Sequence, residues 1–204
     1  MTKVYFLGSC REVGRSAVLV ESNQGEKLLL DYGTRFNEED RLPYKTDLSN
    51  LRGIVPTHCH VDHTGAIPSL YTTQEYPLFT NPVTLRIMEI LLRDTLKVSS
   101  YPYPFGIEEI KKMVKNAYFL NNGVRQKVAD DFYITFLDAG HIPGSVSVLV
   151  EVDGKKLLYT GDMNTQETNL VHSADYSKIP EIDSLIIEST YALRDHPDRS
   201  QLEK

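Results

Sequence analysis

One pattern occurs twice in this chain of 204 residues. Residues 18–31 read VLVESNQGEKLLLD, and residues 148–162 read VLVEVDGKKLLYTGD. In each copy an apolar run, a turn containing glycine and a second apolar run predict a β-hairpin. The repeat therefore predicts a chain of two similar halves, each with a hairpin that leads to an aspartate.

Those two aspartates belong to a larger set of polar residues that follow apolar strands. Five predicted strands end at residues of metal-ligand type: Asp31, His58, His141, Asp162 and Glu188. One acid after a strand is ordinary turn chemistry. Sites in layered α/β proteins gather at the carboxyl ends of strands, so five such residues predict one shared site.

The densest group of candidate ligands is the segment THCHVDH, which begins at residue 57. Alternate residues of an extended segment share a face, so His58 and His60 are expected to point together and Cys59 away from them. A glycine and a proline soon follow, and a helix is predicted to begin near Asp62. That helix would turn Asp62 and His63 toward a second point, which predicts two adjacent half-sites.

Imidazole nitrogens and carboxylate oxygens are ligands that suit zinc. A histidine-rich surface loop or an expression-tag remnant is the alternative, but the segment lies inside the chain behind an apolar strand. A structural zinc site is a second alternative, and such sites usually use Cys and four protein ligands. Because Cys59 is expected to face away, the sequence favours a site with a position open to water.

The remaining pattern predicts a layered α/β domain. A helix is expected to begin after the N-cap Asn81, with Pro82 in its first position, and to end near Lys97. A second helix is predicted at 107–117, and a short helix within the loop at 34–50. The apolar face of the first helix is predicted to consist of Leu85, Met88, Ile90, Leu91 and Leu92. Further strands are predicted at 4–7, 53–55, 78–80, 132–137, 146–152, 156–159 and 184–187.

Composition limits the class of protein. Hydrophobic residues make up 41% and charged residues 25% of the chain, as in soluble globular domains. No apolar run is long enough for a membrane span, and the first residues enter a strand without a signal-peptide pattern. Two cysteines suggest no disulfide framework, which favours the cytoplasm. The net charge of −6 argues mildly against a dedicated nucleic-acid surface, although bound divalent ions would reverse the local field.

These motifs resemble the metallo-β-lactamase superfamily, whose signature is His-x-His-x-Asp-His followed by a later His and a later Asp. The resemblance implies a four-layer αβ/βα sandwich with two Zn²⁺ ions at one edge. It implies that His58, His60 and His141 hold one zinc, that Asp62 and His63 hold the other, and that Asp162 bridges them. Di-iron relatives typically carry Glu at the position of His60, so a hydrolytic zinc enzyme is expected.

The resemblance also assigns roles to three acids. Asp31 is expected to orient the ligand loop, and Asp62 to orient the attacking water. Zinc lowers the pKa of bound water to about 7 and offsets charge on a phosphodiester. Glu188 is expected to lie beside the metals as a further catalytic acid.

Residues 12–17 (EVGRSA) and 188–191 (ESTY) are similar to the β-CASP nucleases within that superfamily. That group includes ribonuclease J and the endonuclease subunit of the cleavage and polyadenylation specificity factor, and the first motif looks closer to the latter and its archaeal relatives. The resemblance implies a ribonuclease for single-stranded RNA in RNA processing, acting as a homodimer or a subunit of a processing complex. Endonuclease and exonuclease activity both stay open.

The end of the chain departs from that family. Residues 1–191 are expected to form the first part of the metallo-β-lactamase-like domain, and 192–204 the start of a cap domain or a disordered tail. The sandwich would then be incomplete at its C-terminus, and the isolated chain weak or inactive. Two other functions stay open: a thioester hydrolase of the glyoxalase II kind, and a non-catalytic RNA-processing subunit.

Overall fold

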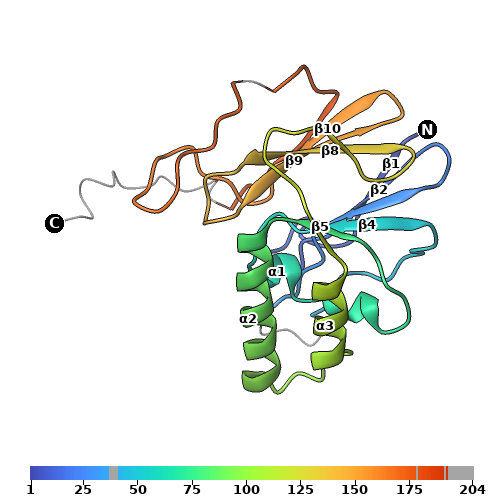
Figure 1. Cartoon of the computed structure of the whole chain (residues 1–204), viewed down its shortest axis with the longest axis vertical. Helices are drawn as coiled ribbons and strands as arrows, with labels where there is room; N and C mark the ends of the chain where they lie inside the picture. Colours follow the sequence, from blue (N-terminus) through green and yellow to red (C-terminus); the bar gives the residue numbers. More distant parts are fainter. Residues whose placement is uncertain (37–40, 178, 191, 193–204) are drawn as a thin grey trace.

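The computed structural model describes residues 1–36, 41–177, 179–190 and 192. Two β-sheets face each other, and helices cover the outer face of one of them (Figure 1). The predicted domain end at 191 and the predicted cap start or tail, apart from residue 192, lie outside the described residues.

The first sheet has six strands in the order β1-β2-β3-β4-β5-β6. Strands β1 to β3 are antiparallel, whereas β3 to β6 run parallel to one another. Their bounds are β1 Lys3–Phe6, β2 Val18–Glu21, β3 Lys27–Leu30, β4 Leu51–Val55, β5 Leu78–Thr80 and β6 Ala117–Phe119.

The second sheet has five strands in the order β11-β10-β9-β8-β7. Among the described strands of this sheet, β10 and β11 pair in parallel and the other neighbours are antiparallel. Their bounds are β7 Gln126–Lys127, β8 Phe132–Asp138, β9 Val146–Val152, β10 Lys155–Tyr159 and β11 Ser184–Ile186.

The predicted repeat is confirmed as a structural one. The first copy forms the β2–β3 hairpin of one sheet, and the second forms the β9–β10 hairpin of the other. In both copies the second hairpin strand pairs in parallel with a later strand, β4 or β11. The two turns also meet, because Asp153 accepts hydrogen bonds from Thr2 Oγ1 and from the backbone N–H of Asn23.

The helices all lie between β4 and β6 in the described part of the chain: α1 Val61–Thr64, the 3₁₀ helix η1 Ile67–Tyr71, α2 Pro82–Val98 and α3 Ile107–Lys115. The start of α2 is confirmed, since Asn81 Oδ1 accepts from the N–H groups of Val83 and Thr84. The second helix ends before the predicted residue 117 because Ala117 opens β6. No helix is found in the described residues of 34–50.

The predicted apolar face of α2 is wrong at one position. Met88 and Leu92 are fully buried, but Ile90 is 57% exposed. Ile90 lies two residues from each of them, which is about 200° around a helix of 3.6 residues per turn. It therefore points to the opposite side.

Among the described residues, none of the helices has both the length and the apolar character that a membrane span requires.

Two buried clusters hold the layers together. Alternation along β2 sends Leu19 to the cluster under the helices, and Val18 and Val20 to the cluster between the sheets. The described residues thus supply a helix, sheet and sheet layer of the predicted four-layer sandwich. None of the helices among them covers the outer face of the second sheet.

Candidate metal centre

Three histidine nitrogens converge where β4 and β8 end. His58 and His60 follow β4, and His141 follows β8. His58 Nε2 lies 3.0 Å from His60 Nδ1, and His141 Nε2 lies 3.4 Å from the same His60 nitrogen. The prediction that His58 and His60 share a face is confirmed.

Asp162, after β10, completes this group. Its Oδ2 lies 3.9 Å from His58 Nε2 and 3.7 Å from His141 Nε2. The four ligand atoms all lie within 4.8 Å of one another. A tetrahedral ion with Zn–N bonds of about 2.0–2.1 Å would hold two nitrogens roughly 3.3 Å apart. The separations fit such an ion, so these four residues could hold a metal.

The hydrogen bonds of Thr57 set the tautomer of His58. The Thr57 hydroxyl donates to Asp31 Oδ2 at 2.9 Å and lies 3.1 Å from His58 Nδ1. Its only hydrogen is already donated, so His58 Nδ1 carries the proton and donates it to Thr57. The lone pair of His58 Nε2 is then left to face the other ligand atoms. Burial and the nearby His63 also hold the pKa of His58 well below its usual value, which keeps the ring neutral.

A second group lies beside the first. His63 is buried, and its Nδ1 lies 2.7 Å from Asp31 Oδ2. Its Nε2 lies 3.3 Å from Asp162 Oδ1 and 3.9 Å from Asp62 Oδ2. Asp162 thus turns one oxygen toward each group, and its role as a bridging ligand stays a prediction.

The charges of the second group are coupled. Burial would lower the pKa of His63, but Asp31 and Asp162 outweigh it and raise that pKa to about 10 in the metal-free chain. Burial would raise the pKa of Asp162, but the hydrogen bond and charge of His63 hold it well below its usual range. Without metal, His63 is therefore protonated, and its positive charge lies between the carboxylates of Asp31 and Asp162.

Asp31 is hydrogen-bonded to several residues of the centre. It is fully buried, and its φ of 57° lies in the left-handed region that Asp tolerates better than most residues. Its carboxylate accepts from Thr57 N–H and Thr57 Oγ1, from His63 Nδ1 and from the Tyr159 hydroxyl. Three of these four hydrogen bonds reach Oδ2, and the one from the Thr57 N–H reaches Oδ1. These contacts hold the backbone and side chain of Thr57 and the ring of His63, and the orienting role of Asp31 stays a prediction.

Two other predicted residues lie near the centre in different ways. Cys59 is buried in the core under the helices, which confirms that it faces away from the histidines. Glu188 is not among the four converging residues. Its carboxylate accepts from the backbone N–H of Met163 at 3.1 Å and of Thr190 at 3.3 Å. It therefore fastens the chain immediately after Asp162.

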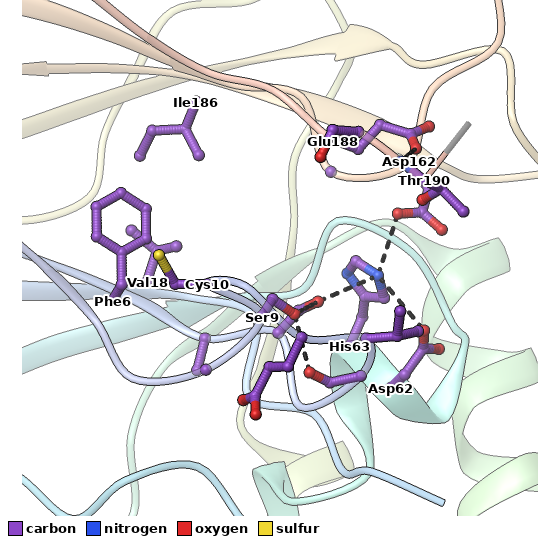
Figure 2. Close-up of a pocket in the computed structure, with 18 of the residues that line it drawn as sticks. Phe6, Ser9, Cys10, Val18, Asp62, His63, Asp162, Ile186, Glu188 and Thr190 are labelled. Atoms are coloured by element: carbon purple, nitrogen blue, oxygen red, sulfur yellow. Dashed lines mark hydrogen bonds and ion pairs between the residues drawn. The ribbon is translucent and has the colours of Figure 1, made fainter. Parts of the chain in front are cut away.

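A cavity of about 490 Å³ opens beside the second group (Figure 2). Asp62, His63, Asp162 and Glu188 line one end of it. The loop at residues 8–14 forms one wall, and Ser16 Oγ lies 3.4 Å from His63 Nε2. The arrangement places an open space next to the candidate ligands.

Sequence patterns missed three residues of the centre: Ser16, Thr57 and Tyr159. The sequence pattern marks Tyr159 only as the end of an apolar strand, and Thr57 only as the start of the ligand loop. Ser16 lies in the motif at residues 12–17, whereas Thr57 and Tyr159 are signalled only by position: Thr57 directly precedes His58, and Tyr159 stands three residues before Asp162.

Comparison with known proteins identifies relatives of this chain. The family model described as "Anti-Pycsar protein Apyc1" matches residues 3–182. The RNase J-like protein of Methanocaldococcus jannaschii is 38% identical over the whole of this chain, which covers 47% of that relative. Ribonuclease TTHA0252 of Thermus thermophilus is 32% identical over 93% of this chain and 44% of its own length.

Further relatives give the same picture. The probable RNase MJ4 of M. jannaschii is 33% identical over 98% of this chain and 48% of its own length. The chain thus spans about half the length of these relatives. Among solved structures, Zn²⁺-bound PqqB from Methylobacterium extorquens has a TM-score of 0.56 at 15% identity, covering 91% of this chain and 71% of PqqB. A metallo-β-lactamase mutant from Cronobacter sakazakii has a TM-score of 0.53 at 20% identity, covering 76% and 60%.

Proposed function

We propose that this chain, which belongs to the family described as anti-Pycsar protein Apyc1, is the metal-binding part of a zinc-dependent ribonuclease. Its fold is that of a metallo-β-lactamase. One observation carries the proposal: three histidine nitrogens and Asp162 converge beside a second group built from His63 and Asp62. Relatives that are themselves described as ribonucleases support RNA as the substrate.

We propose that His58, His60 and His141 hold one Zn²⁺, that Asp62 and His63 hold a second, and that Asp162 serves both. The donors fit, since each of His58 and His63 hydrogen-bonds through Nδ1 to a neighbouring side chain and turns Nε2 toward the other candidate ligands of the site. Bound zinc lowers the pKa of water to about 7 and offsets negative charge on a phosphodiester.

The protein residues have separate tasks in this proposal. Asp62 orients the attacking water, because its carboxylate lines the cavity beside His63. Asp31 holds His63 in place, and Glu188 holds the backbone that carries Asp162. A direct catalytic role for Glu188 stays a prediction. The domain limit at residue 191 also stays a prediction, and so do the formation of a homodimer or a processing complex and a cytoplasmic location.

The test compares substrates on zinc-loaded chain. The substrates are end-labelled single-stranded RNA, the activated diester bis(p-nitrophenyl) phosphate and a glutathione thioester. We expect slow, zinc-dependent cleavage of both phosphodiesters, since the chain spans half of its relatives, and loss of that cleavage in Asp62→Ala. The thioester should stay intact.

Three results would overturn the proposal. Thioester hydrolysis with intact phosphodiesters would replace it with a glyoxalase-like function. Equal RNA cleavage by Asp62→Ala would show that the activity does not come from this centre. RNA binding by a chain that holds no zinc would favour the non-catalytic RNA-processing subunit.

A further inference from the structure

The cavity beside the candidate metal centre has two chemically different ends. Asp62, His63 and Asp162 lie at one end, whereas Phe6 and Ile186 lie on opposite sides of the other (Figure 2). Phe6 is 50% exposed, although it stands on a strand. A large apolar side chain left half-exposed inside a cavity is a candidate contact for a ligand.

The apolar end lies a short way from the metal end. Phe6 pairs with Val18, and Val18 lies two residues after Ser16, whose hydroxyl is 3.4 Å from His63 Nε2. Two residues of extended chain span roughly 7 Å, and residues two apart point to the same face. A group bound between the metal end and Phe6 would therefore be about as long as one nucleoside.

The walls of the cavity are already in place. Arg15 is buried and makes a bidentate ion pair with Glu12, at 2.6 and 3.1 Å, which ties the loop at residues 8–14 to the body of the protein. A Cβ on Gly8 would overlap the Arg15 carbonyl, so the loop closes as tightly as it does only with glycine there. A preformed cavity loses less entropy when a ligand binds.

We propose that the apolar end, formed by Phe6, Val18 and Ile186, is a base-binding subsite that stacks the base next to the scissile phosphate on the Phe6 ring. This inference rests on the proposed function, because it assumes a nucleic-acid phosphodiester at the metal end. Every base has a flat π-face, so stacking on an aromatic side chain holds single-stranded RNA with little dependence on sequence.

A polypeptide surface is the competing use of the same residues. Phe6 and Ile186 stand on β1 and β11, which are the outermost strands of their sheets in the described structure. The observations favour a base, because the apolar wall and the candidate ligands share a single cavity. Binding of a second protein chain to Phe6 and Ile186 would not explain why Asp62, His63 and Asp162 line the same cavity.

The experiment measures equilibrium binding, which does not depend on turnover. Zinc-loaded chain is titrated into two fluorescein-labelled probes, tetra-adenylate and a tetramer of the same sugar–phosphate backbone without bases. Anisotropy gives the Kd, and a gel confirms that the probes stay intact. Base stacking of this kind is worth about 5- to 150-fold in affinity, and we expect wild type to prefer tetra-adenylate within that range.

The variants separate stacking from general effects. Phe6→Ala should bind both probes with nearly equal affinity, and Phe6→Leu should recover only part of the preference. Phe119→Ala is the matched control, because Phe119 is 56% exposed on β6, at the other edge of the same sheet. It should keep the wild-type preference.

Several results would overturn the inference. These are an unchanged preference in Phe6→Ala, an equal loss in Phe119→Ala, or no preference for bases in wild type. A change of oligomeric state in Phe6→Ala, seen by sedimentation with the base preference intact, would assign the surface to protein contacts instead. Zinc-dependent phosphodiester cleavage alongside any of these results would leave the proposed function standing, so the two failures are distinguishable.

Discussion

The hydroxyl of Tyr159 donates a 2.9 Å hydrogen bond to Oδ2 of Asp31, across 128 positions of sequence. Tyr159 ends the hairpin of the second repeat, and Asp31 follows the hairpin of the first. The same oxygen accepts from His63 Nδ1. Residues from both halves of the repeat, Tyr159 and Asp31, therefore help to hold the same candidate ligand, His63.

Tyr159→Phe should weaken zinc binding without unfolding the protein. The ring stays in its buried place, but Asp31 loses one of four donors and His63 is held less firmly. Loss of such an outer partner typically costs 10–100-fold in metal affinity. The check is zinc affinity by competition with a chromophoric chelator, together with the visible spectrum of the cobalt-substituted protein.

Tyr71→Phe is the control for that experiment. Tyr71 is also fully buried, but its hydroxyl donates to the carbonyl of Tyr76, away from the metal centre. It should lose about 1 kcal/mol of stability and keep the wild-type cobalt spectrum. Identical spectra for all three proteins would show that the Tyr159 hydroxyl does not position His63.

Zinc content should separate His60 from its neighbour in sequence. His60→Ala removes a nitrogen that lies 3.0 and 3.4 Å from two other candidate ligands, so bound zinc should fall. Cys59→Ser should leave zinc content nearly unchanged, because the thiol is buried in the core under the helices. Elemental analysis of wild type and both variants measures the zinc content. Equal zinc in wild type and His60→Ala would refute the ligand assignment.

Gly33 should not tolerate a larger residue. A Cβ there would overlap the backbone of Asp62, which must stay close for the α1 turn to present Asp62 and His63. We expect Gly33→Ala to lower both zinc affinity and the thermal midpoint of unfolding. Gly106→Ala is the control, since its nearest contact would be Glu109 Oε2 at 3.7 Å and its φ of −131° suits any residue. A Gly33→Ala protein that binds zinc like wild type would contradict the close approach.

The Glu12–Arg15 pair should make stability depend on pH. The hydrogen bond from Arg15, together with the charges of Arg15 and Arg35, outweighs burial and lowers the pKa of Glu12 below its usual 4.5. A lowered folded-state pKa gives stability that is present above the unfolded value and is lost as pH falls through the folded value.

Glu12→Gln should therefore cost roughly 1–3 kcal/mol at pH 7, as expected for hydrogen bonds to a charged group. The difference from wild type should shrink as pH falls below about 4.5. Urea unfolding of both proteins at pH 7 and pH 3 measures it. A difference that stays constant across this range would mean that ionised Glu12 contributes nothing through its charge.

The sequence was most informative where the structure is local. Strand alternation placed His58, His60 and Cys59 correctly, because an extended segment fixes the faces of its own residues. The repeat placed both hairpins for the same reason. Ile90 was misplaced because a dense run of apolar residues hides which of them is off the helical face.

Long-range contacts could not be read in this way. The bond between Tyr159 and Asp31 depends on how one sheet lies over the other, and no pattern within either strand encodes that. Strand β7 has only two residues, too few for a period to be recognised. The backbone partners of Glu188 likewise follow from the path of the loop after Asp162.

Because the candidate ligands come from both halves of the molecule, an ion bound among them would join the two halves. His58, His60, Asp62 and His63 come from the half before β6, whereas His141 and Asp162 come from the half after it. An ion that binds only when both halves are docked adds its binding free energy to their association, about 4.1 kcal/mol at 1,000 times its Kd. The two halves, produced as separate polypeptides, would accordingly assemble more tightly in zinc than in a chelator.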